Sequence, residues 1–423
     1  MDIPSLEQEK NFYFDSKVGK NLIKLSDRPE LGIFYNPSAN IINKNQKYAI
    51  ITANRLAPWK TAAYASFVPI TCMMWMQIGY GCLVITPFVD VEPVIQKGND
   101  LIQETLSQYN YIRNDKGLKE YVKLGTVVSM ALKVDIWWQE IQVSQVSRLL
   151  ASKLLKYSTS KEQFEKLQDT YFITSDVDLF PLSTRIYSEQ AYDINLINVY
   201  KVDPKKNDLY VALSCIGATL SVWEALVSEQ DYDIQYLNGT GMIELAESEK
   251  ALMLEKNPKL SKTSWYMDQT LGSRWVANYG RRYGWDRINH WKENYVTGRM
   301  DRNSMSEGKW HDAVDENRKH LYKDAHVCRK IWDNDCWWKI YHLLKFHMDD
   351  KMLKEVEVYR NEFVRLMREM RKTKMFFGDG KEGKAALDEE DVEKEWFEKT
   401  GIDVGKSCSR DVICSGFLKY HRK

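Results

Sequence analysis

The sequence has no excess charge of either sign, no internal repeat and no low-complexity tract. Lysine plus arginine amount to 60 residues and aspartate plus glutamate to 59, in a chain of 423. A balance this close gives the protein no overall field that would attract nucleic acid or an anionic membrane surface. We therefore expect no nucleic-acid partner, and any charged ligand must be bound by a local cluster of side chains.

Cysteine pairs at redox or metal-binding spacing are missing as well. The seven cysteines include no CxxC pair and no Cys/His zinc pattern, and Cys72, Cys82 and Cys215 lie in apolar segments where cysteine acts as a small hydrophobe. This usage predicts a reducing compartment, with Cys408 and Cys414 placed for a local bridge. The first residues lack the basic and apolar pattern of a signal peptide, so we expect a cytoplasmic protein.

Charged side chains are absent from residues 61–89, a run longer than the roughly 20 residues that cross a bilayer. Proline, glutamine and two glycines interrupt the run, however, and the preceding KYAIITANR is typical of a strand. We predict a strand at 47–53, a buried helix at about 59–77 and a strand at 82–86. Such a βαβ unit, covered on both faces of its sheet, explains the apolar run without a transmembrane segment.

Strand and helix patterns continue to alternate after this unit. Residues 92–110 and 143–158 have helical periodicity, 124–138 is strand-prone, and 207–227 reads as a strand followed by a helix. The alternation predicts an α/β fold with a mainly parallel central sheet flanked by helices, and a mostly helical C-terminal extension. The predicted divisions are an N-terminal arm at 1–45, a main domain at 46–330 with halves at about 46–180 and 181–330, a helical extension at 331–377 with a long helix at about 349–374, and a peripheral tail at 378–423.

Two aspartates follow an apolar, β-branched run in TYFITSDVDLFPLS, residues 170–183. Because side chains alternate along a strand, we expect Asp176 and Asp178 on one face and Val177 on the other. Two carboxylates this close repel each other and resist burial, and a hard divalent cation such as Mg²⁺ or Mn²⁺ would relieve that repulsion. If the strand is parallel, its carboxyl end is where open α/β sheets bind ligands. The pattern therefore predicts a metal site that bridges to a diphosphate.

FITSDVDLFPL resembles the DxD motif of glycosyltransferases with the GT-A fold, in which a Rossmann-like nucleotide-binding half precedes the motif. The order of predicted elements is similar over roughly residues 47–330. The resemblance implies a hexosyl- or pentosyltransferase that uses Mn²⁺ or Mg²⁺ to transfer a sugar from a UDP- or GDP-sugar to a hydroxyl of a glycan or glycoconjugate. The donor contacts that it implies are Thr52, Ala53, Asn54, Arg148, Asp176 and Val177.

Two further residues take roles by the same resemblance. Asp268, in SWYMDQTLG, stands where inverting members of the family carry the general base, and Trp265 and Tyr266 could desolvate its carboxylate. A helix N-cap is the other interpretation of Asp268. His326, in DAHVCR, stands for a third metal ligand, and an imidazole ligand favours Mn²⁺ over Mg²⁺.

A glycine-rich turn and four arginines complete the predicted site. In YLNGTGM, Asn238 and Gly239 allow the backbone a close approach to a sugar or phosphate, although a plain surface loop fits the same letters. Guanidinium groups bind phosphate oxygens in bidentate fashion. Those in the segment expected to close over the diphosphate are Arg281, Arg282, Arg299 and Arg302, of which Arg302 is taken as an acceptor or phosphate contact.

Two other functions and one other location stay open. A non-catalytic binding or scaffold protein would keep the GT-A-like fold. A haloacid-dehalogenase-type phosphatase also carries DxD after an apolar strand, but Thr or Val continues that motif where Leu179 stands here. Because eukaryotic enzymes that resemble this sequence are usually anchored in the Golgi, the Golgi lumen is the alternative to the cytoplasm if a partner supplies an anchor.

Overall fold

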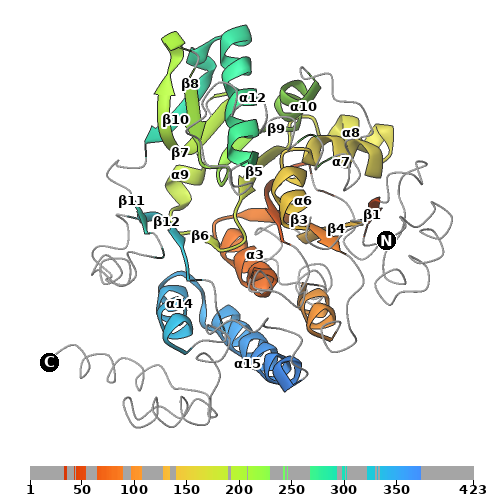
Figure 1. Cartoon of the computed structure of the whole chain (residues 1–423), viewed down its shortest axis with the longest axis vertical. Coiled ribbons are helices and arrows are strands. Elements are labelled where there is room, and N and C mark those ends of the chain that lie inside the picture. The colour runs from red at the N-terminus through yellow and green to blue at the C-terminus, as the bar shows by residue number, and fades with distance from the viewer. Residues whose placement is uncertain are drawn as a thin grey trace, which may run out of the picture.

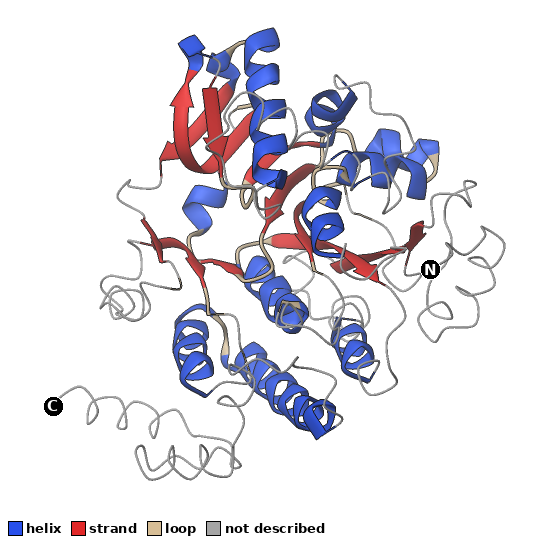
Figure 2. Ribbon diagram, viewed as in Figure 1, coloured by secondary structure: helices blue, strands red, loops and turns tan. Residues whose placement is uncertain are grey.

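The computed structural model of the chain, drawn in Figures 1 and 2, describes the central sheet and the helices around it. The described residues are 33–35, 42, 44–53, 64–88, 97–106, 127–133, 140–188, 192–206, 208–228, 242, 245, 267–292, 298–300, 302, 322–328, 331 and 334–372. The tail at 378–423, with Cys408 and Cys414, lies outside them.

The predicted βαβ unit forms the centre of the main sheet. β2 (Lys47–Thr52) and β3 (Tyr80–Phe88) are parallel neighbours, and α3 (Val68–Gln77) connects them. Pro69 lies in the first turn of α3, where its missing N–H costs no hydrogen bond, and Gly79 follows the helix with φ +88°. The uncharged run is thus a buried helix and a sheet strand. Among the described residues no helix is long and apolar enough to cross a membrane.

Four strands form a parallel block in the order β4-β3-β2-β5. The chain adds β3 and β4 on one side of β2 and then places β5 on the other side, so the strand order reverses between β2 and β5. The carboxyl ends of strands beside such a reversal are where open α/β sheets bind ligands. The elements that complete this part are β4 (Val127–Lys133), α6 (Glu140–Ser147), α7 (Ala151–Ser158), α8 (Lys161–Lys166), β5 (Tyr171–Ser175) and a helix at 97–106.

The flanks of the main sheet are mixed. Beyond β5 the order continues β9-β7-β10, with β9 antiparallel to both of its neighbours, β10 parallel to β7 and β8 antiparallel to β7. The mainly parallel α/β architecture is therefore confirmed for the centre of the sheet. The flanking elements are β1 (Ile33–Tyr35), α9 (Thr184–Ser188), β7 (Ile194–Asp203), η6 (Pro204–Lys206), β8 (Asp208–Val211), β9 (Ile216–Thr219), α10 (Leu220–Ser228), α12 (Met267–Tyr283), η9 (Trp285–Arg287) and β10 (Ile288–Lys292).

A separate three-stranded sheet continues from the aspartates. β6 (Leu179–Pro181) pairs antiparallel with β12 (Tyr322–His326), which pairs parallel with β11 (Gly298–Met300). This small sheet brings residues near 300 and 326 to the end of β5, although more than a hundred residues separate them in sequence. Figure 1 shows it beside the carboxyl ends of the central strands.

The main sheet has an apolar core on each face. One core contains α3 and the C-terminal helices α14 (Asn334–His347) and α15 (Asp350–Lys372), preceded at α3 by η4 (Ala65–Phe67). The other contains α6, α7, α10 and α12. The predicted helical extension thus packs on the same core as α3, and the Tyr359 hydroxyl donates to the Ser66 carbonyl at 2.9 Å.

Three local predictions need correction. The helix expected at 143–158 is two helices, because a turn at residues 148–150 separates α6 from α7. The single strand expected after residue 207 is two strands, β8 and β9, because Cys215 turns the chain with φ 88°. The N-terminal arm, for which no strand was predicted, contributes β1, which pairs antiparallel with β4.

Candidate functional site

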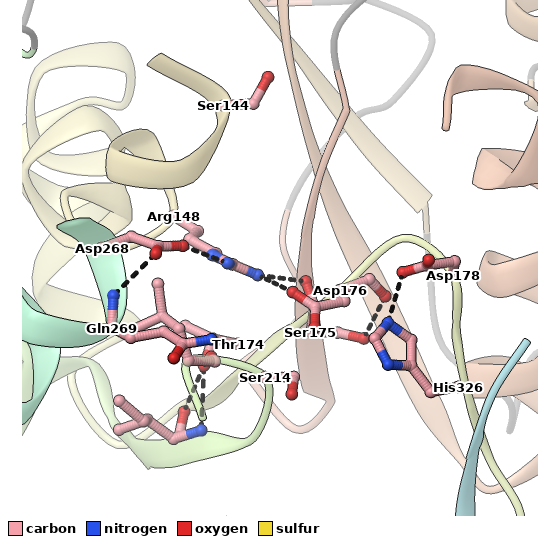
Figure 3. Close-up of polar contacts among 12 residues, drawn as sticks. Ser144, Arg148, Thr174, Ser175, Asp176, Asp178, Ser214, Asp268, Gln269 and His326 are labelled. Atoms are coloured by element: carbon pink, nitrogen blue, oxygen red, sulfur yellow. Dashed lines mark hydrogen bonds and ion pairs between the residues drawn. The ribbon is translucent and has the colours of Figure 1, made fainter. Parts of the chain in front are cut away.

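The two aspartates lie in a turn at the carboxyl end of β5, beside β2. β5 ends at Ser175, the Leu179 amide donates to the Asp176 carbonyl at 3.2 Å, and β6 begins at Leu179. The prediction that strand alternation directs both carboxylates to one face is therefore wrong, because the strand ends before them. In Figure 3 the side chain of Asp176 reaches toward Arg148 and that of Asp178 toward His326.

Val177, between the two aspartates, anchors the turn. Its side chain is buried in the core that contains α3, and its carbonyl accepts a hydrogen bond from the Thr71 hydroxyl. The side chain thus points away from the carboxylates, as expected. It offers no surface to a donor, so the predicted donor contact is limited to the backbone of Val177.

Arg148 joins Asp176 to Asp268. Its Nη1 lies 2.6 Å from Asp176 Oδ1, and its Nη2 lies 2.5 Å from Asp268 Oδ2. Arg148 occupies the turn between α6 and α7 and Asp268 the first turn of α12, and both are buried. Asp268 Oδ1 also accepts from the Gln269 amide at 2.7 Å. With both terminal nitrogens on carboxylates, Arg148 holds an aspartate of the site, and its contact with a donor stays a prediction.

Asp178 belongs to a second cluster, which the small sheet supplies. His326 Nε2 lies 3.1 Å from Asp178 Oδ1, and Arg302 Nη2 lies 3.1 Å from Asp178 Oδ2. The same Arg302 nitrogen contacts Nε2 of His326. The Val327 amide donates to the Asp178 carbonyl at 2.9 Å. The end of β12 is therefore fixed against the turn that carries the aspartates.

Asp176, Asp178 and His326 fit a divalent cation. One ligand atom from each lies within 4.8 Å of the other two. Two carboxylates with one imidazole suit Mn²⁺, and carboxylates also suit Mg²⁺. Nε2 of a neutral His326 cannot both donate to Asp178 and accept from Arg302, because the nitrogen either carries a proton or offers a lone pair. A cation bound to that lone pair and to both carboxylates would satisfy all three groups.

The charges of the two clusters shift the pKa of each carboxyl group differently. Burial acts to raise the pKa of Asp176, but Arg148 outweighs it and holds that pKa well below its usual range. Burial likewise opposes ionisation of Asp178, and His326 with Arg302 brings its pKa below the usual value. For Asp268 burial outweighs Arg148, so its pKa is raised. Asp176 and Asp178 are thus ionised at neutral pH, and the carboxylate of Asp268 is more basic than either of them.

A small cavity opens at the carboxyl ends of β2 and β3, at the same edge of the sheet as the aspartates. Ala53 lines it, and the adjacent Thr52 is 8% exposed. The other lining residues come from β3, from the helix at 97–106 and from the region of α3: Ala65, Val68, Thr86, Asn99, Ile102 and Gln103. Of the predicted donor contacts, Ala53 therefore lines the cavity and Thr52 precedes it at the end of β2, while Asn54, Asn238 and Gly239 lie outside the described residues.

A buried ion pair that the sequence did not reveal supports the small sheet. Arg299 Nε lies 2.8 Å from Asp324 Oδ1, and Arg299 Nη2 lies 3.1 Å from the Ser214 hydroxyl. The Tyr187 hydroxyl donates to Asp324 Oδ2 at 3.1 Å. Arg299, predicted to bind the diphosphate, instead holds β11 and β12 against the loop before β9. Because Asp324 and His326 are two residues apart on β12, this pair fixes the strand that carries the histidine.

Arg281 and Arg282 lie away from the aspartates. Both are exposed in the last turn of α12, and Arg281 donates to Asn278 at 3.1 Å. Asp268 is at the opposite end of that helix, and a rise of about 1.5 Å per residue separates the two ends by roughly 20 Å. The prediction that Arg281 and Arg282 close over the diphosphate is therefore wrong for this structure.

The structure contains a disulfide that was not predicted from the sequence, while the predicted bridge between Cys408 and Cys414 lies outside the described residues. Cys328 and Cys336 form a disulfide between the end of β12 and the start of α14, whereas Cys72, Cys82 and Cys215 are free and buried. Burial raises the pKa of the Cys215 thiol to about 12, so this thiol is inert at neutral pH. A disulfide is favoured by an oxidising compartment. The predicted reducing compartment therefore stays a prediction, and reduction of the Cys328–Cys336 pair is a measurable property of the chain.

Comparison with known proteins found similar solved structures but no sequence match. No family model and no curated protein matches the chain. The galactosyltransferase LgtC, solved with donor and acceptor sugar analogues, has 9% identity and a TM-score of 0.36, over 73% of this chain and 99% of that one. The glycosyltransferase GlyE of Streptococcus pneumoniae TIGR4 has 11% identity and a TM-score of 0.35, over 75% of this chain and 63% of that one.

A third solved structure, the bifunctional glycosyltransferase WbbM, has 9% identity and a TM-score of 0.34, over 78% of this chain and 52% of that one. All three are described as glycosyltransferases, the class that the DxD sequence resembles. Because the identities and TM-scores are this low, the function proposed below rests on the side chains of the site.

Proposed function

We propose that this chain is a metal-dependent glycosyltransferase that transfers a sugar from a nucleoside diphosphate sugar to a hydroxyl of a glycan or glycoconjugate. The observation that carries the proposal is the convergence of Asp176, Asp178 and His326 at the carboxyl end of β5. That end lies where the strand order reverses beside β2, the usual ligand edge of an open α/β sheet. Metal ligands at this edge suit a donor that carries a diphosphate.

The residues of the site have distinct roles in this proposal. Asp176, Asp178 and His326 would hold Mn²⁺ or Mg²⁺, which supplies positive charge against the charge that develops on the departing nucleoside diphosphate. Arg148 keeps Asp176 ionised and in one orientation. Ala53, which lines the small cavity at the carboxyl end of β2, and the adjacent Thr52 would contact the nucleoside.

Asp268 has two roles to separate. Its raised pKa is what a general base near neutral pH needs. Its burial and its ion pair with Arg148 favour an anchor for Arg148 instead. Asp268→Asn keeps an oxygen that accepts from Arg148 but cannot take a proton. If Asp268 is the general base, Asp268→Asn should lose sugar transfer and keep donor binding. If Asp268 only anchors Arg148, Asp268→Asn should largely keep both transfer and donor binding, and Asp268→Ala should lose both.

A thermal-shift panel tests the function. A ligand that binds only the folded state raises the melting temperature, so a UDP- or GDP-sugar should do so in the presence of Mn²⁺ and not without it. Asp178→Ala should abolish the shift. Asp169→Ala, which changes an exposed aspartate at the amino end of β5, should retain it. No metal-dependent shift with any nucleotide sugar would contradict the proposal.

Activity measurements separate this function from its alternatives. A glycosyltransferase should hydrolyse its sugar nucleotide slowly without an acceptor, and only with Mn²⁺ or Mg²⁺. Metal-dependent binding without hydrolysis or transfer would indicate a binding or scaffold protein. Release of phosphate from a monoester, with no action on sugar nucleotides, would indicate a phosphatase.

A further inference from the structure

Arg302 places a cationic nitrogen on the ligand atoms of the candidate metal site. Its Nη2 is 3.1 Å from Asp178 Oδ2 and also contacts His326 Nε2. A divalent cation bound to Asp178 and His326 would need the lone pair of that imidazole nitrogen and the charge of that carboxylate. The guanidinium and the cation therefore compete for the same groups.

The three arginines nearest the aspartates differ in how firmly they are held. The side chains of Arg148 and Arg299 are 7% and 5% exposed, and each makes two buried polar contacts that are away from His326. The side chain of Arg302 is 18% exposed and follows the short strand β11 at the rim of the small sheet. Arg302 is thus the arginine of the three whose side chain is most accessible to solvent.

We propose that Arg302 is a resident counter-ion of the metal site, which gives up Asp178 and His326 to an incoming divalent cation and then binds the diphosphate of the donor. The inference rests on the proposed function, because the diphosphate comes from the sugar nucleotide. Without the metal, Arg302 offsets the negative charge of Asp178, which is 2% exposed. With the metal bound, repulsion between the two cations displaces the guanidinium, and a phosphate anion is its natural next partner.

In this exchange Arg302 weakens the binding of the metal and strengthens the binding of the donor. Its removal should tighten metal binding in the absence of nucleotide, because the competitor is gone. The same change should weaken nucleotide binding once the metal is saturating, because a phosphate contact is gone. A purely structural role for Arg302 would weaken both, and a plain phosphate contact would leave metal binding unchanged.

The test uses the full chain and three variants: Arg302→Gln, Arg302→Lys, which keeps the charge, and Arg281→Gln, which changes an exposed arginine at the far end of α12. Free Mn²⁺ is measured by electron paramagnetic resonance during titration with MnCl₂ alone. UDP and GDP are then titrated by calorimetry in saturating Mn²⁺. Melting temperatures check that each variant is folded.

Arg302→Gln should bind Mn²⁺ on the order of tenfold more tightly than the wild type and bind UDP or GDP on the order of tenfold more weakly. Arg302→Lys should lie close to the wild type in Mn²⁺ affinity, and Arg281→Gln should equal it in both titrations. If the wild type binds Mn²⁺ and Arg302→Gln binds it no more tightly, the counter-ion role is refuted while the metal site stands. If Arg302→Gln is unfolded, the Mn²⁺ affinity of Arg302→Lys is the test instead. A lower Mn²⁺ affinity of Arg302→Lys than of the wild type would refute the counter-ion role. A wild type that binds no Mn²⁺, alone or with either nucleotide, refutes the proposed function and this inference together.

Discussion

Replacing Arg148 by methionine should destabilise the fold strongly, because it removes the guanidinium partner of the buried Asp268 carboxylate. Methionine keeps much of the apolar stem but removes the guanidinium that pairs with Asp268, whose side chain is 2% exposed. Breaking a buried ion pair by removing one partner costs about 3–5 kcal/mol. The side chain of Asp176 is 28% exposed and regains solvent, so most of the loss comes from Asp268. We expect the free energy of unfolding of Arg148→Met to fall by about 3–5 kcal/mol at neutral pH.

The loss should depend on pH in a direction that the pKa shifts determine. Burial raises the pKa of Asp268, and loss of Arg148 removes the main opposing effect, so the pKa rises further in the variant. A carboxyl group with a raised folded pKa contributes stability that is fully present below its unfolded pKa, about 3.9, and is lost as pH rises through the folded pKa. In the wild type, Asp176 has a lowered pKa, and its contribution is lost as pH falls. Both effects make the free energies of unfolding of the variant and the wild type more alike in acid.

Urea unfolding followed by tryptophan fluorescence, at about pH 7 and about pH 5, measures the loss of stability and the part of its pH dependence that comes from Asp268, since the Asp176 contribution falls only below about pH 3.9. The companion variant Arg148→Met/Asp268→Leu removes both charges and should recover most of the lost stability, because a buried pair replaced by apolar groups is often neutral. A loss below about 1 kcal/mol, the range of an exposed ion pair, would refute the reasoning. So would a loss that stays the same at the two pH values.

Two further predictions concern packing and the disulfide. A Cβ on Gly217 would lie 1.9 Å from the Tyr171 hydroxyl oxygen, so Gly217→Ala should cost about 1–3 kcal/mol in urea unfolding; Gly298→Ala, whose Cβ would meet nothing within 4 Å, should be nearly neutral. The Cys328→Ser/Cys336→Ser variant opens a loop with a sequence separation of 8 and should lose about 2–3 kcal/mol. Dithiothreitol should bring the wild type to the same stability and leave the variant unchanged, and equal stability of variant and oxidised wild type would show that no disulfide forms.

The centre of the fold could be predicted from the sequence because local composition determines it. A sheet covered on both faces buries the uncharged run after β2 as a helix followed by a strand, and these are α3 and β3. The turn at 148–150 and the end of β5 at Ser175 could not be predicted in this way. Each is fixed by partners distant in sequence, since Arg148 pairs with Asp268 across 120 residues.

The sequence predicted which residues belong to the candidate site better than it predicted the contacts between them. Asp176, Asp178 and His326 do converge, although the phase of the strand is not the reason. Which arginine meets which carboxylate could not be read from the sequence. Arg299 resembles Arg302 in type and position, yet Arg299 is buried on Asp324 while Arg302 lies on Asp178. The difference depends on the pairing of β11 with β12. A strand of only three residues is too short for its pairing to be predicted from the sequence.

The most direct test of the central claim is a calorimetric titration of UDP and GDP into the wild type and into Asp178→Asn, each with and without Mn²⁺. The asparagine keeps the size of the side chain and removes the charge that would bind the cation. We predict that the wild type binds one of the nucleotides only when Mn²⁺ is present, and that Asp178→Asn loses at least about tenfold in that affinity. Equal affinity with and without the metal, or equal affinity in the variant, would contradict a metal-held diphosphate at this site.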